Sequence, residues 1–184
     1  LLDFEATCTE VGTIHPQEII EFPVLLLRGH GLPEIDRFHR YVKPVNHPHL
    51  TDYCTRVRFF DNLILCHSNY FKEFESWIDN HFPTEEEKSK FTFVTCGNWD
   101  LRYMLPHQAS LWNITVPPYC RRWVDVKKAY LDFTGQRPAG LISMLKNLNL
   151  SHEGRLHSGI DDCQNIAKVL RFLVQENADL RYSE

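Results

Sequence analysis

The sequence predicts an α/β fold in which helices flank a mixed central β-sheet, and three observations support this. Strand-like apolar runs come first along the chain, and strand-like and helix-like segments then alternate. A length of 184 residues with 43% hydrophobic content is sufficient for one domain with a sizeable core. No internal repeat or linker divides the chain, so residues 1–184 are expected to form a single domain.

The N-terminal part of the chain has the pattern of strands. Residues 1–7 resemble the end of a buried strand, and because the chain starts inside this pattern we expect the true amino terminus further upstream. Residues 19–27 form a strongly apolar run, and Pro23 within it favours a strand at or near a sheet edge. A Gly-His-Gly turn signal follows, so residues 32–42 are predicted to form the second arm of a hairpin.

The remaining segments alternate in type. Helical spacing of the apolar residues predicts helices over 50–57, 69–80, 126–133, 141–148 and 161–174. Short β-rich runs predict strands over 91–95 and 122–125, and another helix is expected to begin near Asp100. The charged stretch 85–88 is expected at the surface.

Composition limits the classes of protein to which this chain can belong. No apolar run approaches the ~20 residues that a membrane-spanning helix needs, and no signal peptide is visible. The six cysteines are scattered and form no Cys-x-x-Cys pair, which argues against a zinc site. They are typical of reduced thiols, so we expect an intracellular protein that is cytoplasmic, nuclear or both.

Two carboxylates near the start of the chain indicate a metal. In strand geometry Asp3 and Glu5 point to the same side, and buried carboxylates so close together repel unless a cation lies between them. A hard divalent cation such as Mg²⁺ or Mn²⁺ takes oxygen ligands. Asp100 and Asp162 can complete the oxygen shell, which leaves His157 free for proton transfer.

The order and spacing of these residues resemble the DEDDh family of 3′→5′ exonucleases. That family has Asp-x-Glu on its first strand, an Asp after a later strand, and His-x-x-x-x-Asp at the start of its last helix. Three longer stretches, residues 3–8, 15–23 and 157–162, are similar to the Eri-type exoribonuclease subfamily. The resemblance covers nearly the whole chain and implies a ribonuclease-H-like fold.

The resemblance also implies a reaction and the residues that perform it. The reaction is hydrolysis of the last phosphodiester at a 3′ end, preferably of RNA, with two Mg²⁺ or Mn²⁺ ions and release of nucleoside 5′-monophosphates. The general base would be His157, and the metal ligands would be Asp3, Glu5, Asp100 and Asp162. The terminal nucleotide would be seated by Ala6, Thr7 and Trp99.

Several residues have a second interpretation that the sequence leaves open. Asp100 lies where a helix N-cap would be, and Trp99 could serve core packing instead of base stacking. Asp161, next to a proposed ligand, is interpreted as a surface or capping residue. A set of basic residues could guide phosphates or be solvated surface: Arg121, Arg122, Lys127, Lys128, Arg137, Lys146 and Arg155.

The formal net charge of −4 is unusual for a nucleic-acid-binding protein, because phosphate contacts need positive charge. The proposed ligand carboxylates account for this charge, and bound divalent cations would neutralise it. We therefore expect a monomeric nuclease that binds a short 3′ end of RNA or DNA. Two alternatives remain: a DNA exonuclease of the same fold, and a non-catalytic RNA-binding scaffold protein.

One segment departs from the Eri-type pattern. Eri-type sequences carry a Thr-Gly-Ile turn and a few further residues where this chain runs from Val57 directly into Arg58, Phe59 and Phe60. Either the loop is short in this protein, or a longer loop is missing from the sequence. None of the proposed catalytic residues lies in this segment.

Overall fold

The N-terminal segment joins two three-stranded β-sheets in the computed structural model, which describes residues 1–58 and 70–183. The first sheet, in the order β1–β2–β3, consists of β1 (Glu5–Ala6), β2 (Ile19–Leu27) and β3 (Glu34–Tyr41). The second, in the order β4–β5–β6, consists of β4 (Phe93–Thr95), β5 (Trp123–Asp125) and β6 (Tyr182–Ser183). The Leu25 N–H donates to the Leu1 carbonyl at 2.9 Å, and the Leu2 N–H donates to the Val94 carbonyl at 3.0 Å. The first two residues thus connect the sheets.

The strands run both parallel and antiparallel, as predicted, with the parallel pair in the second sheet. β2 is antiparallel to β1 and β3, β4 is parallel to β5, and β5 is antiparallel to β6. The hairpin of residues 19–27 and 32–42 is present, as are the short strands expected near 91–95 and 122–125. β6 was not predicted, because two residues are too few to show an alternating pattern.

The prediction that residues 19–27 form a strand at or near a sheet edge is wrong, because β2 is the central strand of the first sheet. The first segment pairs with β2 at Leu2 and again at Glu5, but Asp3 and Phe4 between them do not pair. The Leu25 N–H points toward the first segment, so the nitrogen of Pro23, two residues earlier, points the same way. Pro23 therefore faces an interruption in the ladder, where a missing N–H costs little.

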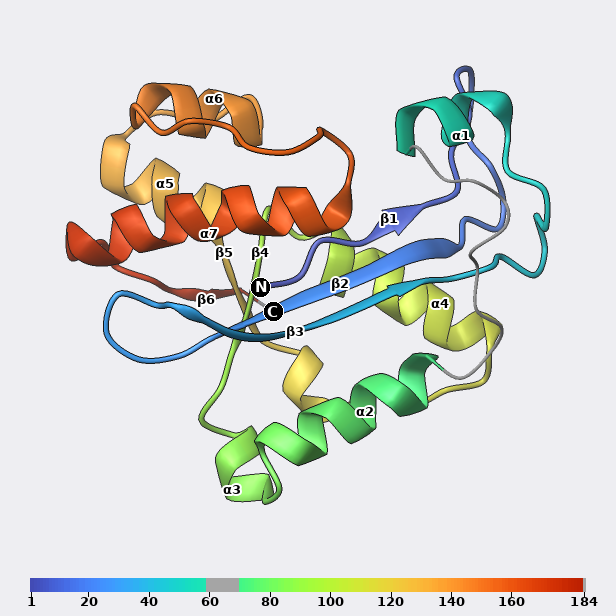
Figure 1. Cartoon of the computed structure of the whole chain (residues 1–184), viewed down its shortest axis with the longest axis horizontal. Coiled ribbons are helices and arrows are strands. Elements are labelled where there is room, and N and C mark those ends of the chain that lie inside the picture. The colour runs from blue at the N-terminus through green and yellow to red at the C-terminus, as the bar shows by residue number, and fades with distance from the viewer. Residues whose placement is uncertain (59–69, 184) are drawn as a thin grey trace.

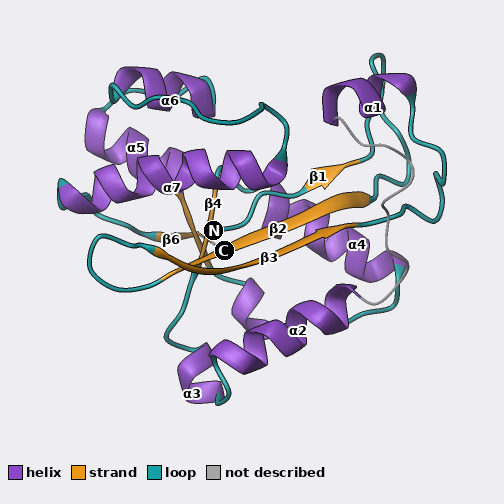
Figure 2. Ribbon diagram, viewed as in Figure 1, coloured by secondary structure: helices purple, strands orange, loops and turns teal. Residues whose placement is uncertain are grey.

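The helices lie on both sides of the strands, with α5, α6 and α7 over one side and α2 and α3 over the other (Figure 1). The α-helices are α1 (Asp52–Arg58), α2 (Tyr70–His81), α3 (Glu85–Lys88), α4 (Leu105–Leu111), α5 (Val126–Thr134), α6 (Leu141–Asn147) and α7 (Gly159–Gln175) (Figure 2). A π-helical segment, η1 (Trp99–Met104), leads into α4, and a 3₁₀ turn, η2 (Pro118–Cys120), precedes β5. The helices predicted from apolar spacing are confirmed.

The charged stretch 85–88 is exposed or partly exposed, as expected, but it forms the short helix α3. The helix is possible because Thr84 and Glu87 form a reciprocal capping box at its start. None of the helices in the described part of the chain is long and apolar enough to cross a membrane. The cysteines at 8, 54, 96, 120 and 163 are free, and Cys66 lies outside the described ranges.

Two buried clusters fix the first strand from opposite sides. On the α2 side, Phe22 packs against Phe4 and Phe74 with ring centroids 4.7 and 4.8 Å apart. On the α7 side the cluster is mainly aliphatic and includes Val124 and Ile166. Each such side chain contributes roughly 1.5–3 kcal/mol when fully buried. The strand that carries Asp3 and Glu5 is therefore held rigidly.

The N-terminus of α7 lies directly against this strand because its first residue is Gly159. A Cβ atom at this position would lie 2.6 Å from the Asp3 carbonyl oxygen and 2.9 Å from Pro23 Cγ. Real Cβ atoms do not approach backbone oxygens so closely. The absent side chain is thus a condition for the contact between α7 and the first strand.

We predict that Gly159→Ala destabilises the protein by about 1–3 kcal/mol, the usual cost of overpacking a well-packed interior. Chemical denaturation of the variant and of the wild type measures the difference. Gly140→Ala is the matched control, because a Cβ at Gly140 meets nothing within 4 Å. Equal stability of Gly159→Ala and wild type would contradict the close approach described above.

Candidate active site

Carboxylates from two separate parts of the chain converge on one cavity of about 780 Å³. Asp3 and Glu5 come from the first strand segment, and Asp162 comes from the first turn of α7. Among the described residues, one group places candidate metal-ligating atoms within 4.8 Å of one another, namely Glu5, His157 and Asp162. Asp3 lines the same cavity but does not belong to that group.

Asp100 is held against the back of the first strand. Its Oδ1 accepts a 2.7 Å hydrogen bond from the Phe4 N–H, across 96 residues of sequence. The N-cap position of η1 is occupied by Asn98, so the capping alternative for Asp100 is not what the structure shows. The bond places this carboxylate one residue away from both Asp3 and Glu5 along the strand.

The buried carboxylates perturb one another. Burial raises the pKa of Asp3 well above its ordinary value, and the charges of Asp100, Asp162 and Glu21 raise it further. Burial likewise raises the pKa of Asp100 to about 7 and the pKa of Asp162 to about 6. In all three the charged form is disfavoured, so this cluster favours a nearby positive charge.

Arg58, at the end of α1, provides positive charge in the structure. Its guanidinium forms an ion pair with Glu5, and its charge lowers the pKa of both Asp3 and Asp162. The Arg58 side chain is largely buried, and its Nε has no hydrogen-bond partner in the described ranges. The sequence interpretation assigned it no role, although it lies where the chain departs from the Eri-type pattern; Phe59 and Phe60 beyond it lie outside the described residues.

The donor set fits divalent cations. The cluster offers carboxylate oxygens and one imidazole, and hard divalent ions take mainly oxygen ligands. Asp162 Oδ1 is buried and has no hydrogen-bond partner among the described residues, so this oxygen is available as a ligand. Arg58 compensates only part of the negative charge of the carboxylates, and a bound cation would compensate the rest.

His157 lies on the exposed loop before α7 and in a left-handed backbone conformation, with φ of 64°. Its N–H donates to Asp162 Oδ2 at 3.0 Å, so the loop is fastened to the proposed ligand. Burial of part of the ring, and then the charge of Arg58, lower the pKa of His157. The imidazole therefore stays neutral at neutral pH and can accept a proton.

The loop is also held by residues that follow it in α7. Asp161 Oδ2 accepts from the Arg155 N–H at 3.0 Å, so this carboxylate fastens the loop and is not a cap of α7, whose N-cap position is Ser158. Asn165 is buried and bonds both the N–H and the carbonyl of Glu153, at 3.0 and 2.8 Å. Sequence reasoning found no role for Asn165, because its partners are backbone groups.

Of the residues proposed to seat a nucleotide, only Trp99 lines the carboxylate cavity. Ala6 and Thr7 are buried and do not line it, although Thr7 borders an adjacent hollow. The Thr7 carbonyl accepts from Gln17 Nε2 at 3.0 Å, which holds this part of the chain in place. Trp99 is 40% exposed, which is incompatible with the core-packing alternative. Trp99 and Gln17 border both the carboxylate cavity and an adjacent hollow of about 420 Å³.

The basic residues predicted as a rim divide into two groups. Lys127 and Lys146 line the carboxylate cavity, and the charge of Lys127 lowers the pKa of Asp100. Arg122 lies elsewhere, with its guanidinium 4.9 Å from the centroid of the Tyr182 ring. Sequence alone could not separate these groups, because charge patterning does not show which surface faces the carboxylates.

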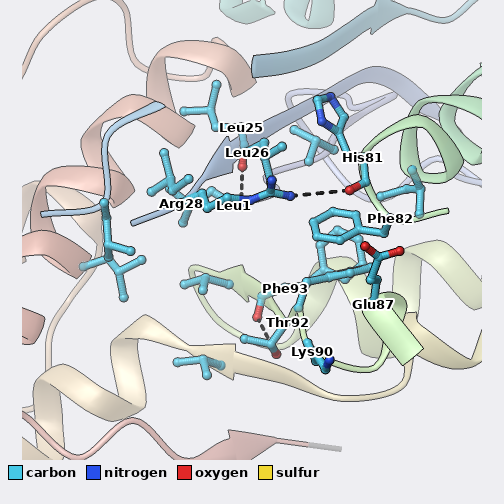
Figure 3. Close-up of a pocket in the computed structure, with 18 of the residues that line it drawn as sticks. Leu1, Leu25, Leu26, Arg28, His81, Phe82, Glu87, Lys90, Thr92 and Phe93 are labelled. Carbon is cyan, nitrogen blue, oxygen red and sulfur yellow. Dashed lines mark hydrogen bonds between the residues drawn. The ribbon is translucent and has the colours of Figure 1, made fainter. Parts of the chain in front are cut away.

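A second cavity, of about 750 Å³, is apolar in character (Figure 3). Leu1, Leu25, Phe82 and Phe93 are among the residues that line it (Figure 3). None of the site residues predicted from sequence borders it. The chemistry of the molecule is therefore expected at the carboxylate cavity.

Comparison with known proteins agrees with this assignment. The family model described as "Exonuclease" matches residues 1–170. ERI1 exoribonuclease 3 of Homo sapiens is 43% identical over 177 residues, covering 94% of this chain and 52% of that protein. 3′-5′ exoribonuclease 1 of Homo sapiens is 32% identical over 191 residues, covering 100% of this chain and 54% of that protein. The chain thus spans about half the length of the curated relatives that it matches.

Solved structures show the same fold. The nuclease domain of 3′hExo, a DEDDh family member bound to rAMP, matches with a TM-score of 0.89 and 32% identity, covering 100% of this chain and 94% of that one. A structure of cell-death related nuclease 4 matches with a TM-score of 0.87 and 26% identity, covering 97% of this chain and 64% of that one. The predicted ribonuclease-H-like fold is confirmed by these matches. The family model, the sequence identities and the shared fold together place this chain in the exonuclease family, among its DEDDh members.

Proposed function

We propose that this chain is a 3′→5′ exoribonuclease that removes nucleoside 5′-monophosphates from RNA in a divalent-metal-dependent reaction. The observation that carries the proposal is the group of Glu5, His157 and Asp162, whose ligand atoms lie within 4.8 Å of one another. One buried carboxylate oxygen of this group has no hydrogen-bond partner in the part of the chain that the structure describes. The curated relatives are named as exoribonucleases, and one solved relative is described as bound to rAMP. These relationships support RNA over DNA as the substrate.

DEDDh exonucleases depend on divalent metals, and the group of Glu5, His157 and Asp162 supports such a site here, for which we propose two ions. Asp3, Glu5, Asp100 and Asp162 would hold them, with Mg²⁺ or Mn²⁺ as the expected species. Bound in this site, the cations would supply activation of the attacking water and stabilisation of the leaving 3′ oxygen. The chain itself positions the carboxylates: the Phe4 N–H orients Asp100, and the His157 N–H orients Asp162.

His157 is the proposed general base. Its lowered pKa keeps the imidazole neutral, and its loop position allows the ring to take a proton from the attacking water. Lys127 and Lys146 border the same cavity and are suited to attract the phosphate.

The terminal nucleotide would bind between the first strand and Trp99. The exposed Trp99 ring provides a surface on which the base can stack, a contact worth ~1–3 kcal/mol. The adjacent hollow, bordered by Thr7, Tyr103 and His107, offers space for that base. A chain end can enter such a hollow, whereas a continuous strand has no end to place there.

The first prediction concerns metal and stability. At a Mg²⁺ or Mn²⁺ concentration one hundred times Kd, the free energy of unfolding of the wild type should increase by roughly 2.7 kcal/mol. Thermal unfolding with metal, compared with unfolding in EDTA, measures this increase. The pKa of the buried Asp100 carboxyl group is raised to about 7, so above that pH the group is charged at a cost to stability. Asp100→Asn removes this charge, while the amide oxygen can still accept from the Phe4 N–H. Above that pH, in EDTA, the variant should therefore be more stable than wild type and should lose most of the metal-induced gain. Full RNA hydrolysis in excess EDTA would contradict the proposed function.

The second prediction concerns the end of the substrate. An RNA oligonucleotide with a free 3′ hydroxyl should be shortened stepwise, a 3′-phosphorylated one far more slowly, and a circular RNA not at all. Trp99→Ala should raise KM by an amount equivalent to ~1–3 kcal/mol, with a smaller effect on kcat. Efficient cleavage of circular RNA would indicate an endonuclease instead, and faster hydrolysis of a matched DNA oligonucleotide would favour a DNA exonuclease.

The third prediction concerns pH. The proposed base works as the neutral imidazole, and its pKa is lowered from the ordinary value of ~6.5 by burial and Arg58. Activity should therefore persist at neutral pH and fall as the pH drops through that lowered pKa. His157→Ala should reduce kcat by ~10²–10⁴-fold and lose this acid limb. The control is His30→Ala, in the exposed turn between β2 and β3, which should behave as wild type; a His157→Ala profile equal to wild type would exclude His157 as the base.

A further inference from the structure

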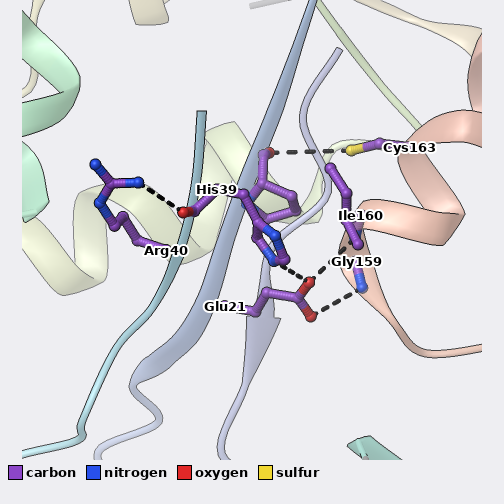
Figure 4. A network of polar contacts seen from close by, with 7 residues as sticks. Glu21, His39, Arg40, Gly159, Ile160 and Cys163 are labelled. Atoms are coloured by element: carbon purple, nitrogen blue, oxygen red, sulfur yellow. Dashed lines mark hydrogen bonds and ion pairs between the residues drawn. The ribbon is translucent and has the colours of Figure 1, made fainter. Parts of the chain in front are cut away.

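A buried carboxylate outside the predicted site, Glu21 in β2, connects the two halves of the candidate active site (Figure 4). Glu21 is 1% exposed, and both of its carboxylate oxygens are engaged. Oε2 accepts from the Gly159 N–H at 2.9 Å, and Oε1 accepts from the Ile160 N–H at 3.1 Å. His39 Nε2 lies 2.8 Å from Oε1.

These contacts serve the N-terminus of α7, which has no cap of its own. Ser158 occupies the N-cap position but makes no side-chain capping bond. The first N–H groups of a helix have no intrahelical acceptor, and a negative group near them is favourable. Glu21 supplies that acceptor from 138 residues away in the sequence.

Glu21 contacts both elements that carry proposed metal ligands, β1 and α7. In the sheet, Glu21 pairs directly with Glu5 of β1. Through α7 it holds the helix turn that contains Asp162 and follows His157. The bonds that the loop makes with Asp161, Asp162 and Asn165 stay within the loop and α7. These three residues therefore do not fix the loop relative to the first strand.

We infer that Glu21 is a positioning residue for the reaction, which sets the placement of His157 and Asp162 relative to Asp3 and Glu5. This inference rests on the proposed exonuclease function. Glu21 does not line the carboxylate cavity, and it would act through the backbone of Gly159 and Ile160. Loss of residues that orient a metal's ligands typically costs 10–100-fold in metal affinity or activity.

The test is Glu21→Gln, which keeps the size of the side chain but turns one acceptor oxygen into a donor NH₂ facing an N–H group. With an RNA oligonucleotide at saturating Mg²⁺, kcat should fall by ~10–100-fold while KM changes little. The Mg²⁺ concentration for half-maximal thermal stabilisation should rise. A purely structural role would lower stability without this split between kcat and KM.

The matched control is Glu18→Gln. Glu18 is also fully buried, and its carboxylate accepts three backbone N–H groups, from Val45, Asn46 and His47, in a loop unrelated to α7. Glu18→Gln should lose thermal stability comparably to Glu21→Gln but keep wild-type kcat. If Glu21→Gln fails to fold, Glu21→Asp carries the test: it keeps the negative charge but is too short to reach both N–H groups, so kcat should again fall.

The outcomes distinguish a failure of the proposed role of Glu21 from a failure of the proposed exonuclease function. An active, metal-dependent wild type with Glu21→Gln or Glu21→Asp no slower than Glu18→Gln would overturn the role of Glu21 alone. A wild type without metal-dependent RNA hydrolysis would overturn the proposed function and this inference with it. A selective loss of kcat in the Glu21 variants, beyond that in Glu18→Gln, supports the inference.

Discussion

The burial of several carboxylates beside one strand is the constraint on which the rest of this structure depends. Glu5, Glu21, Asp100 and Asp162 are all less than 10% exposed, and Asp3 lies among them. Like charges in a medium of low dielectric repel, and each has also lost its hydration. The raised pKa values of Asp3, Asp100 and Asp162 are the direct result.

Backbone N–H groups provide part of the compensation, and in doing so they assemble the site. The Phe4 N–H bonds Asp100, and the N–H groups of Gly159 and Ile160 bond Glu21. Each of these bonds joins segments that are far apart in the sequence. The interactions that make the buried charges tolerable therefore also join η1 to the first strand and α7 to β2. The absent side chain of Gly159 lets the helix approach closely enough for this.

Hydrogen bonds from neutral groups cannot cancel a net charge, so a cation is still required. In the structure Arg58 provides one, through its ion pair with Glu5. Asp162 Oδ1 still has no partner within residues 1–58 and 70–183, and that oxygen together with the neighbouring carboxylates forms the donor set that divalent ions prefer. Much of the negative charge of the chain is concentrated where cations are expected to bind. The acidic net charge is therefore compatible with the hydrolysis of nucleic acid.

Local sequence pattern by itself determined most of the secondary structure and the identity of the acidic residues. The apolar spacing of α2, α5 and α7 reports which face of each helix is buried, and the ordered acidic motifs identified the family, whose fold the structure confirms. The central place of β2, the capping of α7 by Glu21, the presence of Arg58 beside Glu5 and the exposure of Trp99 were decided only by the tertiary structure. The physical reason is that each depends on a partner distant in sequence. Periodicity shows that a side chain or strand is buried, but not which backbone N–H, cation or neighbouring strand meets it there.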